Sequence, residues 1–210
     1  MICIGAVDIS PVDDEVYWKL YALASQERRQ RADRYLRQED ALRCIIADGS
    51  LRYALRQALG TDRVSLARTA SGKPFIPEQE NFHFNLSHSG RWVVIAWSDR
   101  PLGIDVETVL MDGSKEKLAQ RFFHPDEQTY LFSVSGDDRA KRFYEIWTKK
   151  ESYLKYLGTG INRPLDSFSV FDALDAKFHS QLLEGAVLTL CAQEPVCHLI
   201  HLTPKMLRRD

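Results

Sequence analysis

The sequence predicts an α+β protein made of two similar halves. Helical patterns of apolar residues fill residues 11–59, strand-like runs fill 82–107, and helices followed by strands return after residue 107. A doubly wound parallel sheet would instead show strict alternation of strands and helices. The 210 residues suit one large domain or two small ones. We therefore expect an N-terminal α+β half at residues 1–102 and a C-terminal α+β half at 103–210.

Three helices are expected in the N-terminal half. The first covers about Pro11–Ala24, because Ser10 supplies a capping hydroxyl and proline and acidic residues fill the first turn. A second, basic helix covers Ser25–Arg37. The third runs from about Glu39 to Leu59, where Gly60 is a stop signal.

The remaining elements follow from turn residues and from the period of the apolar pattern. Ser71–Pro74 is typical of a turn, and the β-rich or alternating runs after it predict strands at 82–86, 92–97 and 102–107. In the C-terminal half, helices are expected at about 115–123, 125–132 and 138–157, and strands near 168–171, 186–191 and 196–202.

The charge balance excludes one broad class of function. The chain has 28 Lys and Arg against 29 Asp and Glu, a formal net charge of −1. A protein that coats nucleic acid needs a strong excess of positive charge. We therefore expect no nucleic-acid partner.

The chain ends and the cysteines bear on location. No basic region precedes an apolar stretch at the N-terminus, and no window approaches the ~18 apolar residues of a membrane-spanning helix. The four cysteines include no C-x-x-C pair. These features predict a cytoplasmic protein with free thiols and no membrane partner.

The segment Gly103–Glu107 carries two carboxylates on one strand face. Asp105 and Glu107 project to the same side about 7 Å apart, while Ile104 and Val106 point to the core. A hard divalent cation such as Mg²⁺ prefers such oxygen ligands. The alternative is a strand end with two solvated acids.

The helix around Trp147–Lys155 places charges beside an apolar arc. Lys150 falls inside the arc, where a cation is out of place unless an anion awaits it or its stem reaches solvent. Glu151 and Lys155 lie one turn apart, which also fits an ordinary surface ion pair. An acid and two lysines at this place suit a site for Mg²⁺ and a polyphosphate.

Two further segments could bind phosphate. Ser87 and His88 lie in a polar stretch after a strand, where backbone N–H groups and hydroxyls can hold a phosphate; a tight hairpin turn is the alternative. Arg28 and Arg31 share a helix face, with Arg43 further along, and form a basic patch that fits a phosphate or a solvated surface.

Taken together, these segments resemble the Sfp-type 4′-phosphopantetheinyl transferases, which prime carrier proteins with the coenzyme A arm. The family's first signature, G-[IV]-D-[IV]-E, is present as Gly103–Glu107, and its second, [FW]-x-x-K-E-[SA]-x-x-K, as Trp147–Lys155. Gly72–Pro74 and Asn85–Gly90 also look like elements of the family. The similarity extends over about residues 25–170.

The resemblance implies a pseudodimer of α+β halves with the active site at their interface. It implies that Asp105, Glu107 and Glu151 hold Mg²⁺ or Mn²⁺ and that Lys155 stabilises charge on the departing phosphate. Glu127 matches a glutamate proposed as the general base, a role that a metal-bound water could also fill. The implied catalytic residues are thus Glu127, Glu151 and Lys155.

The resemblance also implies how coenzyme A is held as the substrate. Phosphates would meet the serine, histidine, lysine and arginine side chains, and the adenine would lie beside Lys73 and Pro74. The residues implied to bind coenzyme A are Arg28, Arg31, Arg43, Lys73, Pro74, Ser87, His88, Lys150 and Lys155.

The implied reaction transfers the 4′-phosphopantetheine arm to a serine of an apo acyl or peptidyl carrier protein, leaving adenosine 3′,5′-bisphosphate. The partner would be an acidic helical bundle that docks near residues 108–123, where Lys115 and Lys117 lie, on a monomeric enzyme. Carriers of fatty acid, polyketide or peptide synthesis all fit. Two alternatives remain open: a Mg²⁺-dependent nuclease or other phosphoryl transferase, and a non-catalytic regulatory domain that binds coenzyme A.

Overall fold

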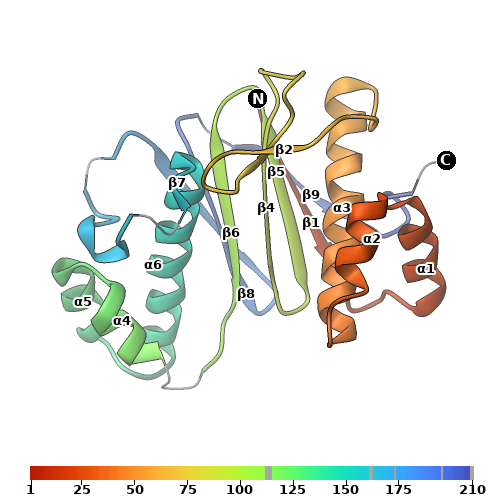
Figure 1. Ribbon diagram of the computed structural model, residues 1–210. Helices are drawn as coiled ribbons and strands as arrows, with labels where there is room; N and C mark the ends of the chain where they lie inside the picture. The colour runs from red at the N-terminus through yellow and green to blue at the C-terminus, as the bar shows by residue number, and fades with distance from the viewer. Residues whose placement is uncertain (112–114, 161–162, 173, 195, 209–210) are drawn as a thin grey trace.

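Two β-sheets share one hydrophobic core, and a long helix covers the outer face of each (Figure 1). The computed structural model describes residues 1–111, 115–160, 163–172, 174–194 and 196–208. The α+β class expected from the sequence is confirmed.

The first sheet has the strand order β4-β5-β1-β9. Its strands are β1 (Ile2–Asp8), β4 (His83–Ser89), β5 (Trp92–Ser98) and β9 (Val196–Leu202). β1 pairs antiparallel with β5 and parallel with β9, so the last strand joins the sheet of the first. β1 was not expected; it lies between two neighbouring strands and is buried over most of its length.

The second sheet has the order β6-β8-β7 and is antiparallel throughout. Its strands are β6 (Leu102–Thr108), β7 (Lys177–Leu183) and β8 (Ala186–Ala192). β7 was not expected, and the strand expected near 168–171 is wrong, because that segment is an irregular loop after a short 3-10 helix at Leu165–Ser167.

Helices α1 (Asp14–Leu23), α2 (Gln26–Ala32) and α3 (Gln38–Leu59) lie beside the first sheet (Figure 1). Ser25 caps α2 by accepting a hydrogen bond from the backbone N–H of Arg28, and Gly60 ends α3 with a φ of 68°. The second helix is shorter than expected, since it ends at residue 32. α3 packs against β5.

Helices α4 (Glu116–Phe122), α5 (Pro125–Phe132) and α6 (Gly136–Leu157) belong to the second sheet's side (Figure 1). A capping box between His124 and Glu127 starts α5, and Gly158 ends α6 with a φ of 68°. α6 packs along β6 and β8.

A small hairpin joins α3 to the first sheet. Its strands are β2 (Ala67–Arg68) and β3 (Pro74–Phe75), and Gly72 makes the turn with a φ of 86°. The turn expected at Ser71–Pro74 is therefore confirmed.

The edge strands of the two sheets, β4 and β6, lie side by side (Figure 1). Side chains rather than a strand ladder connect them: the Asn85 Oδ1 accepts a hydrogen bond from the backbone N–H of Ile104 at 2.9 Å. We call this contact between β4 and β6 the seam.

Within the described ranges, no helix is both long enough and apolar enough to pass through a membrane. Cys44 and Cys191 are buried free thiols.

Candidate active site

The seam brings two carboxylates of β6 to two serines of β4. Alternate residues of β4 face β6, so the hydroxyl of Ser87 donates to Asp105 Oδ1 at 2.8 Å and that of Ser89 donates to Glu107 Oε2 at 2.8 Å. Asp105 is only 3% exposed, whereas Glu107 is half-buried. The spacing of two along each strand thus creates two parallel serine–carboxylate contacts.

Lys155 of α6 completes this group of side chains. Its ammonium donates to Asp105 Oδ1 at 2.7 Å, to Ser87 Oγ at 3.0 Å and to the backbone carbonyl of Ile104 at 3.1 Å. Three elements, β4, β6 and α6, therefore meet at one cation. The surface ion pair between Lys155 and Glu151, which the helical spacing left open, is not the contact that forms.

A glycine allows α6 to lie this close to β6. A Cβ placed on Gly103 would lie 2.1 Å from the carbonyl oxygen of Ser152 and 2.3 Å from the backbone N of Tyr156. These are backbone atoms of α6, which cannot rotate away as a flexible side chain can. The absence of a side chain at 103 sets the distance at which Lys155 reaches Asp105.

The three acids of the site repel one another. Burial, Asp105 and Glu151 raise the pKa of Glu107, against the lowering effect of Ser89 and Lys155. Burial and Asp105 also raise the pKa of Glu151, and Lys155 opposes them. The site thus holds more negative charge than its cation neutralises.

The carboxylate oxygens of these acids are the type of ligand that a divalent cation prefers, although the three side chains do not converge on one point. Asp105 Oδ2 is buried and has no hydrogen-bond partner among the described residues. No three His, Cys, Asp or Glu side chains in that part of the chain form a group that could hold a metal ion. An unsatisfied carboxylate oxygen beside two acids of raised pKa fits a hard cation.

A basic cleft lies on the N-terminal side of the seam. Its volume is about 260 Å³, and it opens between α2, α3, the small hairpin and β4. Four residues predicted to bind coenzyme A line it: Arg28, Arg31, Pro74 and His88. The polar side chains in the lining that were not predicted include Tyr35 and Arg68.

The cations of the basic cleft are held by neighbours. Arg28 Nε lies 3.5 Å from Asp48 Oδ1, and Arg31 Nε donates to the hydroxyl of Tyr35 at 3.3 Å. Partial desolvation at the cleft and the charges of Arg43 and Lys155 lower the pKa of His88. The imidazole is therefore mostly neutral near pH 7, and an anion bound beside it would favour the protonated form.

Arg43 lies next to the cleft rather than in its lining. Its guanidinium donates to the carbonyl of Gly90 at 2.7 Å and to Asp40 Oδ1 at 2.7 Å. It thereby fixes the turn between β4 and β5, which follows Ser89.

The ammonium of Lys73 is bound to main chain of the C-terminal half. It donates to the carbonyl of Leu102 at 3.2 Å and to that of Lys155 at 2.5 Å. Burial lowers the pKa of Lys73 to about 8. This geometry does not support contact of the ammonium with an adenine.

Glu127 and Lys150 lie away from the seam, in the interior of the C-terminal half. The two side chains are 0% exposed, and Lys150 Nζ lies 2.8 Å from Glu127 Oε2. Glu127 also accepts from the backbone N–H groups of His124 and Val170, at 2.8 and 2.7 Å. Neither side chain reaches the seam in this arrangement, so the implied roles of base and phosphate ligand stay predictions that the geometry does not favour.

The expected apolar face of α6 is present, and within it Lys150 contacts a carboxylate and the backbone of a neighbouring segment. Its ammonium donates to the carbonyls of Leu165 and Phe168 at 2.7 Å each and lies 4.3 Å from the Phe168 ring centroid. Phe168 begins the irregular segment that we expected to be a strand, and Leu165 belongs to the short 3-10 helix before it.

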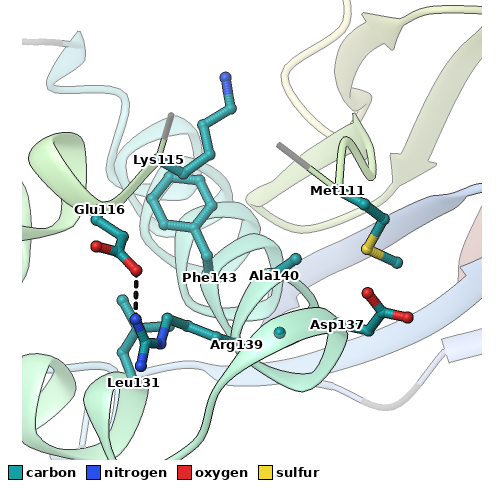
Figure 2. Close-up of a pocket in the computed structure, with 9 residues that line it drawn as sticks. Met111, Lys115, Glu116, Leu131, Asp137, Arg139, Ala140 and Phe143 are labelled. Carbon is teal, nitrogen blue, oxygen red and sulfur yellow. Dashed lines mark hydrogen bonds and ion pairs between the residues drawn. The ribbon is translucent and has the colours of Figure 1, made fainter. Parts of the chain in front are cut away.

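Two cavities flank the segment 108–123. One, of about 350 Å³, adjoins the seam and is lined by Ser89, Glu107 and the apolar side chains of Leu118, Phe143 and Trp147. Figure 2 shows the other, of about 160 Å³, where Phe143 again contributes and Arg139 is ion-paired with Glu116.

Sequence reasoning missed Asn85, Ser89 and Arg68 as members of the site. The first two could have been found from alternation, since both lie two residues from Ser87 on β4. Arg68 had no local signal, because only the hairpin brings it to the cleft.

Comparisons with known proteins place the chain in a family. Residues 101–197 match the model of the 4′-phosphopantetheinyl transferase superfamily, and residues 10–100 match that of the N-terminal part of 4′-phosphopantetheinyl transferases. The seam thus joins one strand from each matched region.

Three relatives show how far the likeness extends. A 4′-phosphopantetheinyl transferase of Bacillus subtilis is 41% identical over 80% of this chain and 75% of its own. The transferase Sfp of Bacillus subtilis strain 168 is 35% identical over 76% of this chain and 71% of its own, and psf-1 of Bacillus pumilus is 34% identical over 79% and 73%. The chain belongs to the 4′-phosphopantetheinyl transferase family.

Proposed function

We propose that this protein transfers the 4′-phosphopantetheine arm of coenzyme A to a serine of an apo carrier protein, in a reaction that depends on Mg²⁺ or Mn²⁺. The serine oxygen forms a bond to the phosphorus that carries the pantetheine arm, and the bond from that phosphorus to the bridging oxygen of the pyrophosphate breaks. Adenosine 3′,5′-bisphosphate leaves, and the serine proton passes to a base.

One observation carries the proposal: Lys155 is held at the seam by Asp105 and by Ser87, and the next two residues of β4 line the basic cleft (His88) and an apolar cavity (Ser89). Phosphoryl transfer is catalysed mainly by positioning and by cations at the oxygens where charge develops. A nucleotide in the cleft and a pantetheine arm in the cavity would place the pyrophosphate at this lysine.

Asp105, Glu107 and Glu151 are the residues that would hold the divalent cation. The partnerless Oδ2 of Asp105 and the raised pKa values of the two glutamates support this assignment. When bound, the cation would neutralise charge on the pyrophosphate oxygens.

We infer that Glu127 is not the base, and we assign Glu151 to the cation alone, because a carboxylate that holds a divalent cation is not free to accept a proton. Glu127 is enclosed with Lys150 and is 0% exposed.

The basic cleft is the proposed place of the nucleotide. Arg28, Arg31 and His88 would meet the 3′-phosphate, and Pro74 would border the adenine. In the protein without coenzyme A, Asp48 pairs with Arg28. The bound 3′-phosphate would take the place of Asp48 as the partner of this guanidinium.

The carrier would dock on the segment 108–123, of which residues 112–114 lie outside the described residues. Lys115 and Lys117 offer positive charge to an acidic helical bundle, and the cavities on either side offer apolar surface. In Figure 2 the ammonium of Lys115 points away from the ring of Phe143.

The test incubates the protein with coenzyme A, Mg²⁺ and apo carriers from fatty acid, polyketide and peptide synthesis, and then measures the intact mass of each carrier. At least one carrier should gain one phosphopantetheine, and EDTA or Asp105→Ala should stop the gain while circular dichroism stays native. If no carrier gains mass from folded protein, the proposed activity is wrong.

A further inference from the structure

The small hairpin contacts two different parts of the site. On one side, Ala67, Arg68 and Pro74 line the basic cleft. On the other, the hydroxyl of Ser71 donates to the carbonyl of Gly158, just after the end of α6. The hairpin therefore lies between the proposed nucleotide position and the helix that carries Lys155.

Lys73 makes the second contact with α6. The last carbonyls of a helix have no partner within the helix, and a cation there is favoured by the helix dipole. α6 ends at Leu157, so the carbonyl of Lys155 is one of these groups, and it accepts from the Lys73 ammonium at 2.5 Å. Lys73 thus satisfies the backbone of the residue whose side chain enters the seam.

The same ammonium also holds the start of β6. It donates to the carbonyl of Leu102 at 3.2 Å, three residues before Asp105. One side chain of the hairpin therefore joins the end of α6 to the beginning of β6, the two elements that bring Lys155 and Asp105 together.

Desolvation of the ammonium offsets the stability that the helix dipole gives to this contact. Lys73 is half-buried, carbonyls rather than a carboxylate are the hydrogen-bond partners of its ammonium, and burial lowers its pKa to about 8. A cation buried without a carboxylate costs free energy, whereas an apolar side chain of the same length would not. A costly group at this place indicates a role in the site.

We propose that Lys73 is a positioning residue, which acts through the carbonyls of Leu102 and Lys155 to keep the Lys155 ammonium at Asp105. This inference rests on the proposed function. It assigns to the Lys73 ammonium a task within the protein, in place of the contact with adenine that the resemblance implies. Because the hairpin also lines the cleft, a bound nucleotide would stabilise the same arrangement.

The first test is the steady-state kinetics of Lys73→Met, which keeps the length of the stem and removes the ammonium. We expect kcat to fall about tenfold, the equivalent of one lost hydrogen bond to a charged group, while KM for coenzyme A changes little. Thermal stability should stay level or rise. The control is Lys141→Met, at an exposed position on α6, which should leave kcat unchanged.

A double-mutant cycle separates positioning from a general structural effect. If Lys73 acts through Lys155, then Lys73→Met should slow the enzyme much less in a Lys155→Met background, because no ammonium remains to be positioned. Ser71→Ala, at an exposed site, should lower kcat less than Lys73→Met does, and its effect should likewise shrink in the Lys155→Met background. Additive losses in the cycle, or a wild-type kcat for Lys73→Met, would overturn the inference.

A readout without turnover keeps this test apart from that of the proposed function. Hydrogen exchange of the backbone amides in the last turn of α6 and at the start of β6 should be faster in Lys73→Met than in wild type or Lys141→Met. Unchanged exchange would refute the positioning role even in an active enzyme. An inactive wild type with faster exchange in the variant would refute the proposed function instead.

Discussion

The ammonium of Lys155 lies 2.7 Å from Oδ1 of Asp105, and this contact joins the two signature segments of the chain. The second oxygen of the same carboxylate is buried and lacks a hydrogen-bond partner in the described part of the chain. Asp105 therefore faces Lys155 with one oxygen and keeps the other available, an arrangement in which one carboxylate can serve a lysine and a cation together.

Lys155→Met should reduce kcat far more than it reduces the affinity for coenzyme A. Removal of a donor that faces developing charge typically costs about 10²–10³ in kcat. The buried Asp105 would also lose the ammonium of Lys155 as a partner, so the free energy of unfolding should fall by about 1–3 kcal/mol. Stopped-assay kinetics with a carrier and urea denaturation measure the two effects.

The matched control is Lys141→Met, whose partner Asp138 lies in solvent on the same helix. It should change neither quantity appreciably, since exposed pairs contribute about 0–1 kcal/mol. A Lys155→Met enzyme with wild-type kcat and a raised KM would instead mean that Lys155 only binds substrate.

Gly103→Ala should disrupt the site through the backbone. The added Cβ would lie 2.1 Å from the Ser152 carbonyl, so α6 must move away from β6 and take Lys155 with it. We expect a loss of at least about 3 kcal/mol in the free energy of unfolding, at the upper end for overpacking, together with loss of activity.

Gly49→Ala is the comparison for this substitution. Its new Cβ would meet the Cβ of Leu207 at 3.2 Å, a contact that a shift of Leu207 by a few tenths of an ångström relieves, and alanine favours a helix by about 1 kcal/mol over glycine. Its effect in urea denaturation should therefore be small. Equal stability of the Gly103→Ala protein and wild type would contradict the close approach of the two elements.

Glu127→Gln should act on stability and not on the reaction. Breaking a buried ion pair leaves a charge without its partner, here Lys150, at a cost of about 3–5 kcal/mol. Glu127→Leu combined with Lys150→Met should recover much of that loss. In the folded fraction at low temperature, kcat should remain near that of wild type.

The opposite result would restore the base role that the resemblance implies. In that case Glu127→Gln would unfold at the wild-type urea concentration, its kcat would be lost, and the acidic limb of its pH profile would disappear. The two measurements thus assign Glu127 to the fold or to the chemistry.

Local patterns predicted the helices of this fold better than its strands. Caps and stop signals lie within a few residues of each other, so Ser25 and Gly60 mark helix ends correctly. β1 and β7 were missed because partners distant in the sequence decide whether they form; β1 pairs with β9 at the other end of the chain. The residue types at 168–171 predicted a strand, but this segment forms an irregular loop whose Phe168 carbonyl binds Lys150.

The candidate site divides in the same way. Alternation along β6 placed Asp105 and Glu107 on one face, and both do contact serines of β4. Lys150 and Lys73 could not be placed from the sequence, because their partners are backbone carbonyls and, for Lys150, a carboxylate from another helix. A lysine inside a signature indicates that it is needed, whereas its role depends on what the fold puts next to it.

Glu151→Gln should stabilise the metal-free protein at neutral pH. Burial and Asp105 raise the pKa of Glu151, so the folded state binds a proton more tightly than the unfolded chain does. The stability due to this group is therefore present at low pH and is lost as the pH rises from the unfolded value of about 4.3 through the raised folded value. Above that window, wild type carries the full cost of the charged glutamate and the amide variant does not.

Thermal denaturation in EDTA, from pH 4 to pH 8, tests this expectation. The melting temperature of Glu151→Gln should exceed that of wild type near pH 7.5, and the difference should shrink toward pH 4. Added Mg²⁺ should raise the melting temperature of wild type more than that of the variant, because the cation offsets the repulsion that the substitution has already removed. Glu145→Gln, which alters an ion pair with Lys149 on the same helix, should show neither effect. A Glu151→Gln protein that melts below wild type in EDTA at pH 7.5 would mean that the three acids do not repel one another, and the case for a cation between them would fail.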